Sequence, residues 1–159
     1  MRDLLSDENE ILSCAFTGHR EIGVDFDLQK LENCIENLIK EGVSEFYNGG
    51  AYGFDLIAAE TVLKFKQKYP VKLIICVPFY EQDKNYSKEN KARYSSILKF
   101  ADEVVIVCDH YYKGCFLKRN DYMIDRADFL IAYLKEKRGG TAYTVKKFRA
   151  KKGDNIYFI

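Results

Sequence analysis

Apolar runs of strand length alternate along the chain with stretches whose apolar residues recur every three or four positions. In the first such stretch, Leu28, Leu31, Ile35 and Leu38 mark one face of a helix. Turn residues separate the two kinds of segment, an arrangement typical of βα units. We therefore expect strands at residues 11–16, 43–47, 71–77, 103–108, 128–134 and 155–159, with helices between them.

The six expected strands are short and apolar enough to be buried, and helix-length segments join them. A parallel pair of strands needs such a crossover, whereas an antiparallel pair needs only a tight turn. We therefore predict a Rossmann-like, doubly wound α/β fold with a mostly parallel six-stranded sheet and helices on both faces. With 159 residues, the chain suits a single domain of this kind over residues 1–159.

The loops that follow strands are the places to search for a site, because ligands of doubly wound sheets bind beyond the carboxyl ends of the strands. The loop after the first strand is Thr17-Gly18-His19-Arg20. Its glycine lets the backbone approach a ligand, and its arginine is a forked donor suited to phosphate oxygens. Two alternatives stay open: Arg20 pairs with Glu21 or Asp25 on the surface, and His19 is an ordinary loop residue.

A glycine-rich stretch, Gly49-Gly50-Ala51-Tyr52-Gly53, joins the second strand to a helix. Free N–H groups at a helix start bind anions, and glycines remove side chains that would keep a phosphate away. The spacing matches neither the dinucleotide nor the P-loop fingerprint, so a simple turn is the alternative. Asp55 can cap the helix or accept a sugar hydroxyl, but it would repel a phosphate beside it. We expect phosphate over the glycine backbone and a sugar hydroxyl or polar base near Asp55.

A second pair of glycines, in Gly139-Gly140-Thr141, follows the fifth strand at an equivalent junction, and Thr141 is the expected N-cap of the next helix. Between the two loops, Asn120 lies in line with Phe116 and Met123 and interrupts an apolar stripe. A buried amide without a partner is costly. Asn120 therefore either caps a neighbouring backbone group or faces a ligand, and its place near the carboxyl edge favours the ligand.

Composition narrows the classes of partner. Lys and Arg number 25 and Asp and Glu 24, so the net charge of +1 creates no overall field that recruits nucleic acid or an anionic membrane. This balance argues against nucleic acid as a partner, and we expect no membrane partner. The five cysteines contain no C-x-x-C pair, and the two histidines lack a matching carboxylate cluster, so we expect no metal site.

The same sequence features bear on the compartment. Cysteines within apolar strands indicate a reducing environment. Acids interrupt the first 16 residues, so we expect no signal peptide there. No run approaches the ~20 apolar residues that a membrane span requires. We therefore expect a cytoplasmic protein.

Several motifs, in this order, resemble the YpsA-like family of the SLOG superfamily, named for its Smf/DprA and LOG branches. They are TGHR (17–20), GGAYGFD (49–55), VPF with Gln82, RNDYMID (119–125), ADFLIAY (127–133) and GGT (139–141). The resemblance implies a Rossmann-like domain that binds a nucleotide or a nucleotide-derived ligand. The expected ligand-binding residues are Thr17, Gly18, His19, Arg20, Gly49, Gly50, Ala51, Gly53, Asp55, Pro78, Asn120, Gly139, Gly140 and Thr141.

The chain departs from the LOG enzymes, which cleave the N-glycosidic bond of nucleotide monophosphates. Their motif resembles Gly-Gly, Gly-Thr and a glutamate about three residues later, whereas here Gly53 precedes Phe54 and Asp55, and the next glutamate is Glu60. This difference argues against phosphoribohydrolase activity.

Three functional hypotheses remain. The first is a cytosolic sensor or regulator that binds a nucleotide-derived molecule, either NAD- or ADP-ribose-like or a nucleoside phosphate. The second is a hydrolase of an N-glycosidic or phosphate bond, with Asp55 as its general acid or base. The third, disfavoured by the balanced charge, is a DprA-like protein that binds single-stranded DNA. The sequence establishes no cofactor and leaves a homo-oligomer open.

Overall fold

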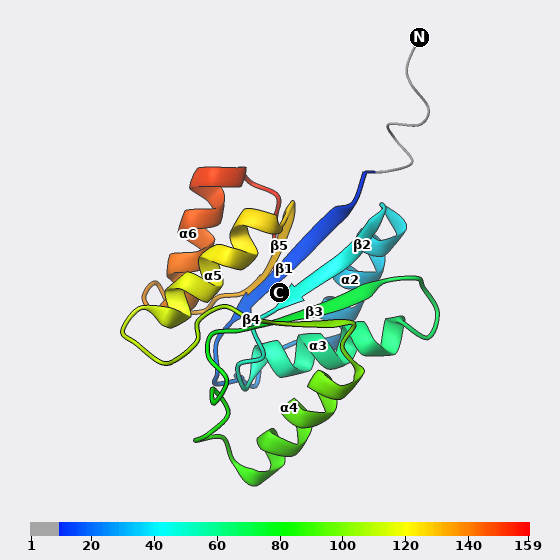
Figure 1. Cartoon of the computed structure of the whole chain (residues 1–159). Helices are drawn as coiled ribbons and strands as arrows, with labels where there is room; N and C mark the ends of the chain where they lie inside the picture. The colour runs from blue at the N-terminus through cyan, green and yellow to red at the C-terminus, as the bar shows by residue number, and fades with distance from the viewer. Residues whose placement is uncertain (1–9) are drawn as a thin grey trace.

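A computed structural model describes residues 10–159, and within that range the chain forms six strands and five helices (Figure 1). The expectation that no signal peptide is present rests partly on residues 1–9, which lie outside the described residues. The elements are β1 (Leu12–Gly18), α2 (Leu28–Lys40), β2 (Val43–Asn48), α3 (Phe54–Phe65), β3 (Lys72–Val77), α4 (Lys88–Phe100), β4 (Glu103–Ile106), α5 (Cys115–Arg126), β5 (Phe129–Tyr133), α6 (Gly140–Lys152) and β6 (Ile156–Phe158).

The strands form one sheet in the order β4-β3-β2-β1-β5-β6, and every neighbouring pair is parallel. This confirms the predicted doubly wound α/β fold. The chain builds outward from β1 to β4 on one side and then crosses over to add β5 and β6 on the other. The order of strands therefore reverses between β1 and β5, where doubly wound folds bind ligands.

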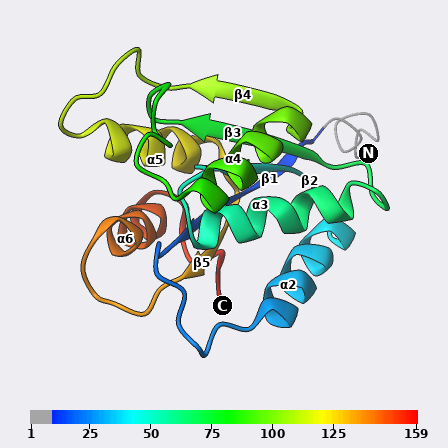
Figure 2. The ribbon, with the colours of Figure 1, turned by 90° about the horizontal axis from the view of Figure 1, so that it is seen from below.

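Helices cover both faces of the sheet. In Figure 2, α2, α3 and α4 lie on one face, and α5 and α6 lie on the other. Two separate clusters of buried side chains match this division. Phe16 and Cys14 of β1 pack with α2, α3 and α4, whereas Ala15 between them packs with Met123 of α5 and Phe148 of α6. The central strand is thus buried on both sides, as its continuous apolar run predicts.

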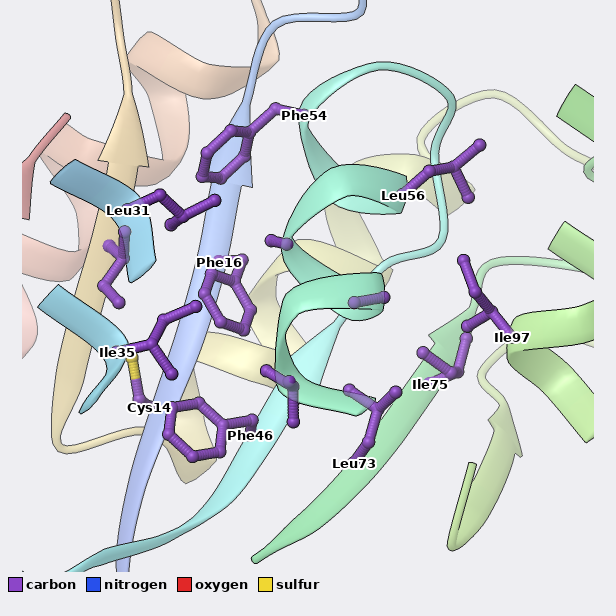
Figure 3. Packing of buried hydrophobic residues seen from close by; sticks show 14 of the residues in the cluster. Cys14, Phe16, Leu31, Ile35, Phe46, Phe54, Leu56, Leu73, Ile75 and Ile97 are labelled. Atoms are coloured by element: carbon purple, nitrogen blue, oxygen red, sulfur yellow. The ribbon is translucent and has the colours of Figure 1, made fainter. Parts of the chain in front are cut away.

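The larger cluster is built around aromatic rings (Figure 3). The rings of Phe16 and Phe46 stack with centroids 5.9 Å apart, and Phe54 meets Phe16 edge to face at 6.3 Å. Each of these side chains is fully buried, which stabilises the fold by about 1.5–3 kcal/mol per side chain. Because Phe54 opens α3, this packing also fixes the start of the helix beside the end of β1.

The two edge strands differ from the prediction. The segment 103–108 is expected to be a buried strand, but β4 ends at Ile106 and three of its four residues are exposed. β6 is also largely exposed. Only the inner strands have a neighbour on each side and helices over both faces, so an apolar run alone does not reveal which strand lies at an edge.

Helix boundaries largely follow the sequence signals. Asp27, a residue type that favours the N-cap, caps α2 and accepts a hydrogen bond from the Lys30 N–H. α3 ends at Phe65, and turn and bend residues separate it from Pro70. Within the described residues, no helix is long and apolar enough to cross a membrane.

Candidate functional site

A cavity of about 680 Å³ lies at the carboxyl edge of the sheet, at the point where the strand order reverses. Residues of four segments line it: the loop after β1, the start of α3, one face of α5, and the loop that leads from β5 into α6. Nine of the predicted ligand-binding residues are among them: Thr17, Gly18, His19, Arg20, Ala51, Asp55, Asn120, Gly140 and Thr141.

The loop after β1 and the glycine-rich loop after β2 are interlocked. The Phe54 N–H donates to the His19 carbonyl at 3.1 Å. Gly53 has a φ of +88°, and a side chain there would place its Cβ 2.2 Å from the Arg20 carbonyl oxygen. A Cβ on Gly18 would lie 2.3 Å from the Phe54 ring. Close contact between the loops therefore requires glycine at both positions, and at Gly53 the positive φ favours glycine as well.

The glycine-rich loop satisfies several of its own polar groups. The Gly50 N–H donates to Asn48 Oδ1 at 2.8 Å, and the Ala51 N–H donates to Asp55 Oδ2 at 3.3 Å. The other end of the Asn48 amide donates to the Asp55 carbonyl at 2.8 Å. Two of the amides expected to face a phosphate are thus already paired within the protein.

Three side chains from other segments hold the carbonyl groups of the same loop. Arg119 donates to the Gly49 carbonyl at 2.5 Å, and Gln82 donates to that carbonyl at 3.0 Å. The Tyr86 hydroxyl donates to the Gly50 carbonyl at 3.0 Å. Gly49 and Gly50 are both buried behind this set of contacts. The loop is consequently a rigid wall of the cavity.

Asp55 presents an unpaired oxygen. The residue is 7% exposed, and its Oδ1 atom is buried without a hydrogen-bond partner. Burial raises the pKa of Asp55 to about 6, although Arg119, the Ala51 N–H and Arg20 act in the opposite direction. A buried polar atom without a partner is unusual and costly in native proteins. Because Asp55 lines the cavity, a ligand that carries a hydrogen-bond donor would satisfy this oxygen.

Arg119 is a buried residue that the sequence reasoning missed. It is 5% exposed and also donates to the Cys76 carbonyl and to Asn120 Oδ1, at 3.2 and 2.9 Å. Burial lowers its pKa, and the charge of Asp55 opposes this effect. One sequence signal could have identified it. Residues four apart share a face of a helix, and this spacing places Arg119 in line with Cys115 and Met123, which are both buried.

The prediction that Asn120 is a buried amide is wrong in one respect. Asn120 lines the cavity but is only half-buried, and its amide oxygen accepts from Arg119. The helix turns by about 100° per residue, so the residue before it occupies the inward position. Arg119, which is charged, is therefore more deeply buried than its neutral neighbour Asn120.

The start of α6 has a different character from the glycine-rich loop. Its N-cap is Gly139, which has no side-chain capping bond, so the prediction that Thr141 is the cap is wrong. Thr141 instead lies in the first turn, where it lines the cavity. A Cβ added at Gly139 or Gly140 would meet no atom within 4 Å. This helix start is open, and its first N–H groups have no partner within the described residues.

Arg20 lies at the same cavity with its guanidinium between two aromatic rings. Its Cζ lies 5.1 Å from the centroid of Tyr52 and 5.6 Å from that of Phe116. The alternative, an ion pair of Arg20 with Glu21 or Asp25, does not form, because Asp25 pairs with Lys135 at 3.2 Å and no carboxylate of the described residues lies within 4 Å of Arg20. The rings orient the guanidinium and leave its N–H groups free.

The other predicted site residues lie outside the lining of the cavity. Gly49, Gly50 and Gly53 support its wall from behind, and Gly139 precedes the lining residues of α6. Pro78 is buried after β3, where its carbonyl accepts from the Cys108 N–H at 3.0 Å. Among residues 10–159, no group of three His, Cys, Asp or Glu side chains is placed to hold a metal ion.

Comparison with known proteins agrees with the motifs. The model of the YpsA family, described as the YspA SLOG family, matches residues 15–159. UPF0398 protein YpsA of Bacillus subtilis (strain 168) is 33% identical over 162 residues, which cover 91% of this chain and 90% of that protein. The SPbeta prophage-derived protein YoqJ of the same organism is 36% identical over 126 residues, or 70% of this chain and 74% of that protein.

Two solved structures share the fold. DNA processing protein A from Helicobacter pylori, for which a unique single-stranded DNA binding mode is described, has a TM-score of 0.64 and 22% identity. DprA from Streptococcus pneumoniae has a TM-score of 0.69 and 21% identity. The match covers 92% and 93% of this chain but only 64% and 50% of those chains.

These neighbours correct one prediction. The balanced charge argued against nucleic acid as a partner, yet a protein with this fold is described as binding single-stranded DNA. The argument fails physically because a net charge of +1 is summed over the whole chain. Binding depends instead on the charges along one surface.

Proposed function

Because this chain belongs to the YpsA family of SLOG proteins, we propose that it binds a nucleotide-derived small molecule in the cavity between the β1 and β5 loops. In this proposal it acts in the cytosol as a sensor or regulator. The ligand is a phosphorylated ribonucleoside, either a nucleoside phosphate or a larger molecule of the ADP-ribose or NAD type. A cavity of about 680 Å³ lies within the usual range for ligand pockets of this kind.

The observation that carries the proposal is the unpaired Oδ1 of Asp55 in a cavity that also contains the guanidinium of Arg20, for which no ion pair is found among the described residues. An ionised carboxylate accepts hydrogen bonds but cannot donate them. A ribose hydroxyl is a donor of the right type, and it keeps the negative phosphate away from Asp55. The ligand therefore directs its sugar, rather than its phosphate, toward α3.

The phosphate belongs at the opposite side of the cavity, at the start of α6. The Gly50 and Ala51 amides donate within the protein, whereas the first N–H groups of α6 are unpaired and no side chain shields them. Such a helix start attracts anions through its N–H groups and its dipole. Arg20 supplies a guanidinium at the same cavity. The β2 and β5 loops flank β1, so the two subsites lie about 10 Å apart, two strand spacings.

Calorimetry with adenosine 5′-monophosphate, ADP-ribose and unphosphorylated adenosine tests this proposal. Arg20→Ala should weaken binding of the phosphorylated ligands by about tenfold or more, the worth of one charge-assisted hydrogen bond. Its melting temperature should stay within a few degrees of the wild type, because Arg20 is exposed. Arg126→Ala is the matched control, since Arg126 ends α5 away from the cavity. Equal affinities for AMP in all three proteins would count against the assigned pocket.

A second candidate is hydrolysis of an N-glycosidic or phosphate bond, and one observation favours it. The pKa of Asp55, raised to about 6 by burial, suits a group that exchanges protons near neutral pH. Incubation with nucleotides and NAD, followed by chromatography for released base, ribose or phosphate, separates an enzyme from a sensor. Binding without turnover favours the sensor.

A third candidate, single-stranded DNA binding, follows the description of the Helicobacter pylori neighbour. The observation in its favour is the set of exposed rings at the carboxyl edge, Tyr80, Tyr111 and Tyr112, on which bases can stack. An electrophoretic shift with single-stranded DNA that weakens steeply with added salt would support this function.

A further inference from the structure

His19 connects the loop after β1 to the segment that leads into α6. Its Nε2 atom accepts a hydrogen bond from the Lys135 N–H at 2.8 Å and another from the Glu136 N–H at 3.3 Å. The ring lies edge to face against Tyr133, with centroids 5.9 Å apart. The backbone of residues 135–138 makes no other hydrogen bond within the described part of the chain. One imidazole nitrogen therefore accepts both of the backbone hydrogen bonds that this segment makes in the described part of the chain, and an exposed ion pair between Lys135 and Asp25 lies beside them.

The contact constrains the chemical state of the imidazole. A nitrogen that accepts hydrogen bonds carries no proton, so the ring is neutral with its proton on Nδ1. Protonated imidazole has two N–H donors and no acceptor. If Nε2 gains a proton, it faces the Lys135 and Glu136 N–H groups as a third donor. Both hydrogen bonds are then lost, and the exposed ion pair between Lys135 and Asp25, a weak kind of contact, is left to hold the segment.

The tethered segment carries the open start of α6. Residues 135–138 lead directly into Gly139, Gly140 and Thr141, and Gly140 and Thr141 line the cavity. A Cβ added at either glycine would meet no atom within 4 Å, so there is open space beside the backbone at this point. The position of the helix start relative to Arg20 and Asp55 therefore depends on the segment that precedes it.

We propose that His19 is a positioning residue whose neutral imidazole holds the anion-binding start of α6 against the cavity and releases it when protonated. The effect on ligand rests on the proposed function, because it concerns the same site, but the tether itself does not. Imidazole changes charge between about pH 5 and pH 8. Affinity for a phosphorylated ligand should consequently fall as the pH falls through this range.

Other ionisable groups surround His19 and must be separated from it. Tyr133 comes from β5, and Lys135 and Glu136 come from the tethered segment. Asp25 pairs with Lys135, and Arg20 and Glu21 share the loop of His19. Across the cavity, Asp55 of α3 has a pKa raised by burial to about 6, so it titrates in the same range. A change in affinity with pH is therefore not enough to identify His19.

Hydrogen exchange of the free protein, read at the Lys135 and Glu136 amides, tests the tether without any ligand. His19→Gln places an amide oxygen the same number of bonds from the backbone as Nε2 and does not titrate, whereas His19→Leu removes the acceptor. After correction for intrinsic rates, wild-type protection should fall about tenfold or more from pH 7.5 to pH 5.5. Protection should be independent of pH in His19→Gln and absent in His19→Leu. Wild-type protection that survives at pH 5.5, or that persists in His19→Leu, would overturn the proposal.

Titration with ADP-ribose then tests the consequence for binding, because its doubly esterified diphosphate does not change charge over this pH range, whereas the phosphate monoester of AMP does. In the Asp55→Asn background, which removes the titrating carboxyl group of the cavity, affinity should still fall about tenfold from pH 7.5 to pH 5.5. Adding His19→Gln should abolish that fall while affinity at pH 7.5 is retained. A fall that persists with His19→Gln overturns the positioning role. If wild-type protein binds neither AMP nor ADP-ribose at any pH, the proposed function fails, and the exchange measurement still decides the tether.

Discussion

Two glycine-containing junctions, each between a strand and a helix, have opposite environments in this protein. At the β2–α3 junction, the amides of Gly50 and Ala51 are paired internally, and three side chains hold the carbonyls of Gly49 and Gly50. At the β5–α6 junction, a Cβ added at either glycine would meet no atom within 4 Å, and the helix has no capping side chain. Similar sequence signals thus mark a braced wall in one case and an open helix start in the other.

The difference shows that a glycine pair has two distinct physical uses. In the first junction, the glycines allow two protein segments to approach each other, as Gly53 and Arg20 do. In the second, they leave space that protein atoms do not fill. Only unfilled space beside unpaired N–H groups can receive a ligand. The anion subsite is therefore better assigned to α6 than to the more glycine-rich loop.

The largest expected effect tests the braced junction. Gly53→Ala should lower the free energy of unfolding by about 3 kcal/mol or more, because the new Cβ meets the Arg20 carbonyl at 2.2 Å and φ is +88°. Gly139→Ala is the matched control, since its φ of +98° is similar but no atom lies within 4 Å. Gly139→Ala should lower the free energy of unfolding by about 1 kcal/mol, because only the strain of a positive φ contributes there. Urea unfolding that gives equal costs would contradict the contrast between the two junctions.

Arg119→Met removes the main brace of the first junction. The Gly49 and Cys76 carbonyls would lose a buried donor, so we expect the free energy of unfolding to fall by about 2–4 kcal/mol. Arg126→Met, at the exposed end of the same helix, should cost less than about 1 kcal/mol. Chemical denaturation of both variants provides the measurement. Similar values for the two would show that Arg119 does not brace the loop.

Asp55→Asn tests the unpaired oxygen through pH. Burial raises the folded pKa to about 6, whereas an unfolded aspartate titrates near 3.9. Between about pH 3.9 and pH 6, Asp55 keeps its proton in the folded state but loses it in the unfolded state. The free energy of unfolding of the wild type therefore falls as the pH rises toward 6. The variant should therefore be more stable than the wild type by about 3 kcal/mol at pH 8, and equal to it below about pH 4. Denaturation curves with a gap that does not change with pH would contradict this account.

Gly140→Ala should have the smallest effect on stability. The position is helical, has an ordinary φ and has open space around it, so the free energy of unfolding should change by less than about 1 kcal/mol. The added methyl group would nevertheless lie between the helix start and a phosphate. We expect affinity for AMP to fall about tenfold while affinity for adenosine is unchanged, as measured by calorimetry. Equal affinity for AMP in the variant and the wild type would remove α6 from the site.

The fold was predictable because strand-length segments rich in apolar residues alternate along the chain with helix-length segments, which is the rhythm of a parallel sheet. The exposed state of β4 was not predictable, since strand order depends on contacts between distant segments. For the site, the convergence of the β1, β2 and β5 loops follows from the parallel sheet. The roles of Arg119 and Asn48 do not, because a side chain that binds a remote carbonyl leaves no local pattern in the sequence.

The most direct test of the central claim is a titration of ¹⁵N-labelled protein with AMP, followed through the backbone amide resonances. The account predicts large, saturable shifts at Gly140 and Thr141 and at the Thr17–Arg20 loop, while the internally bonded Gly50 amide stays nearly unchanged. Shifts concentrated at Gly49–Gly53, with the start of α6 unaffected, would contradict it.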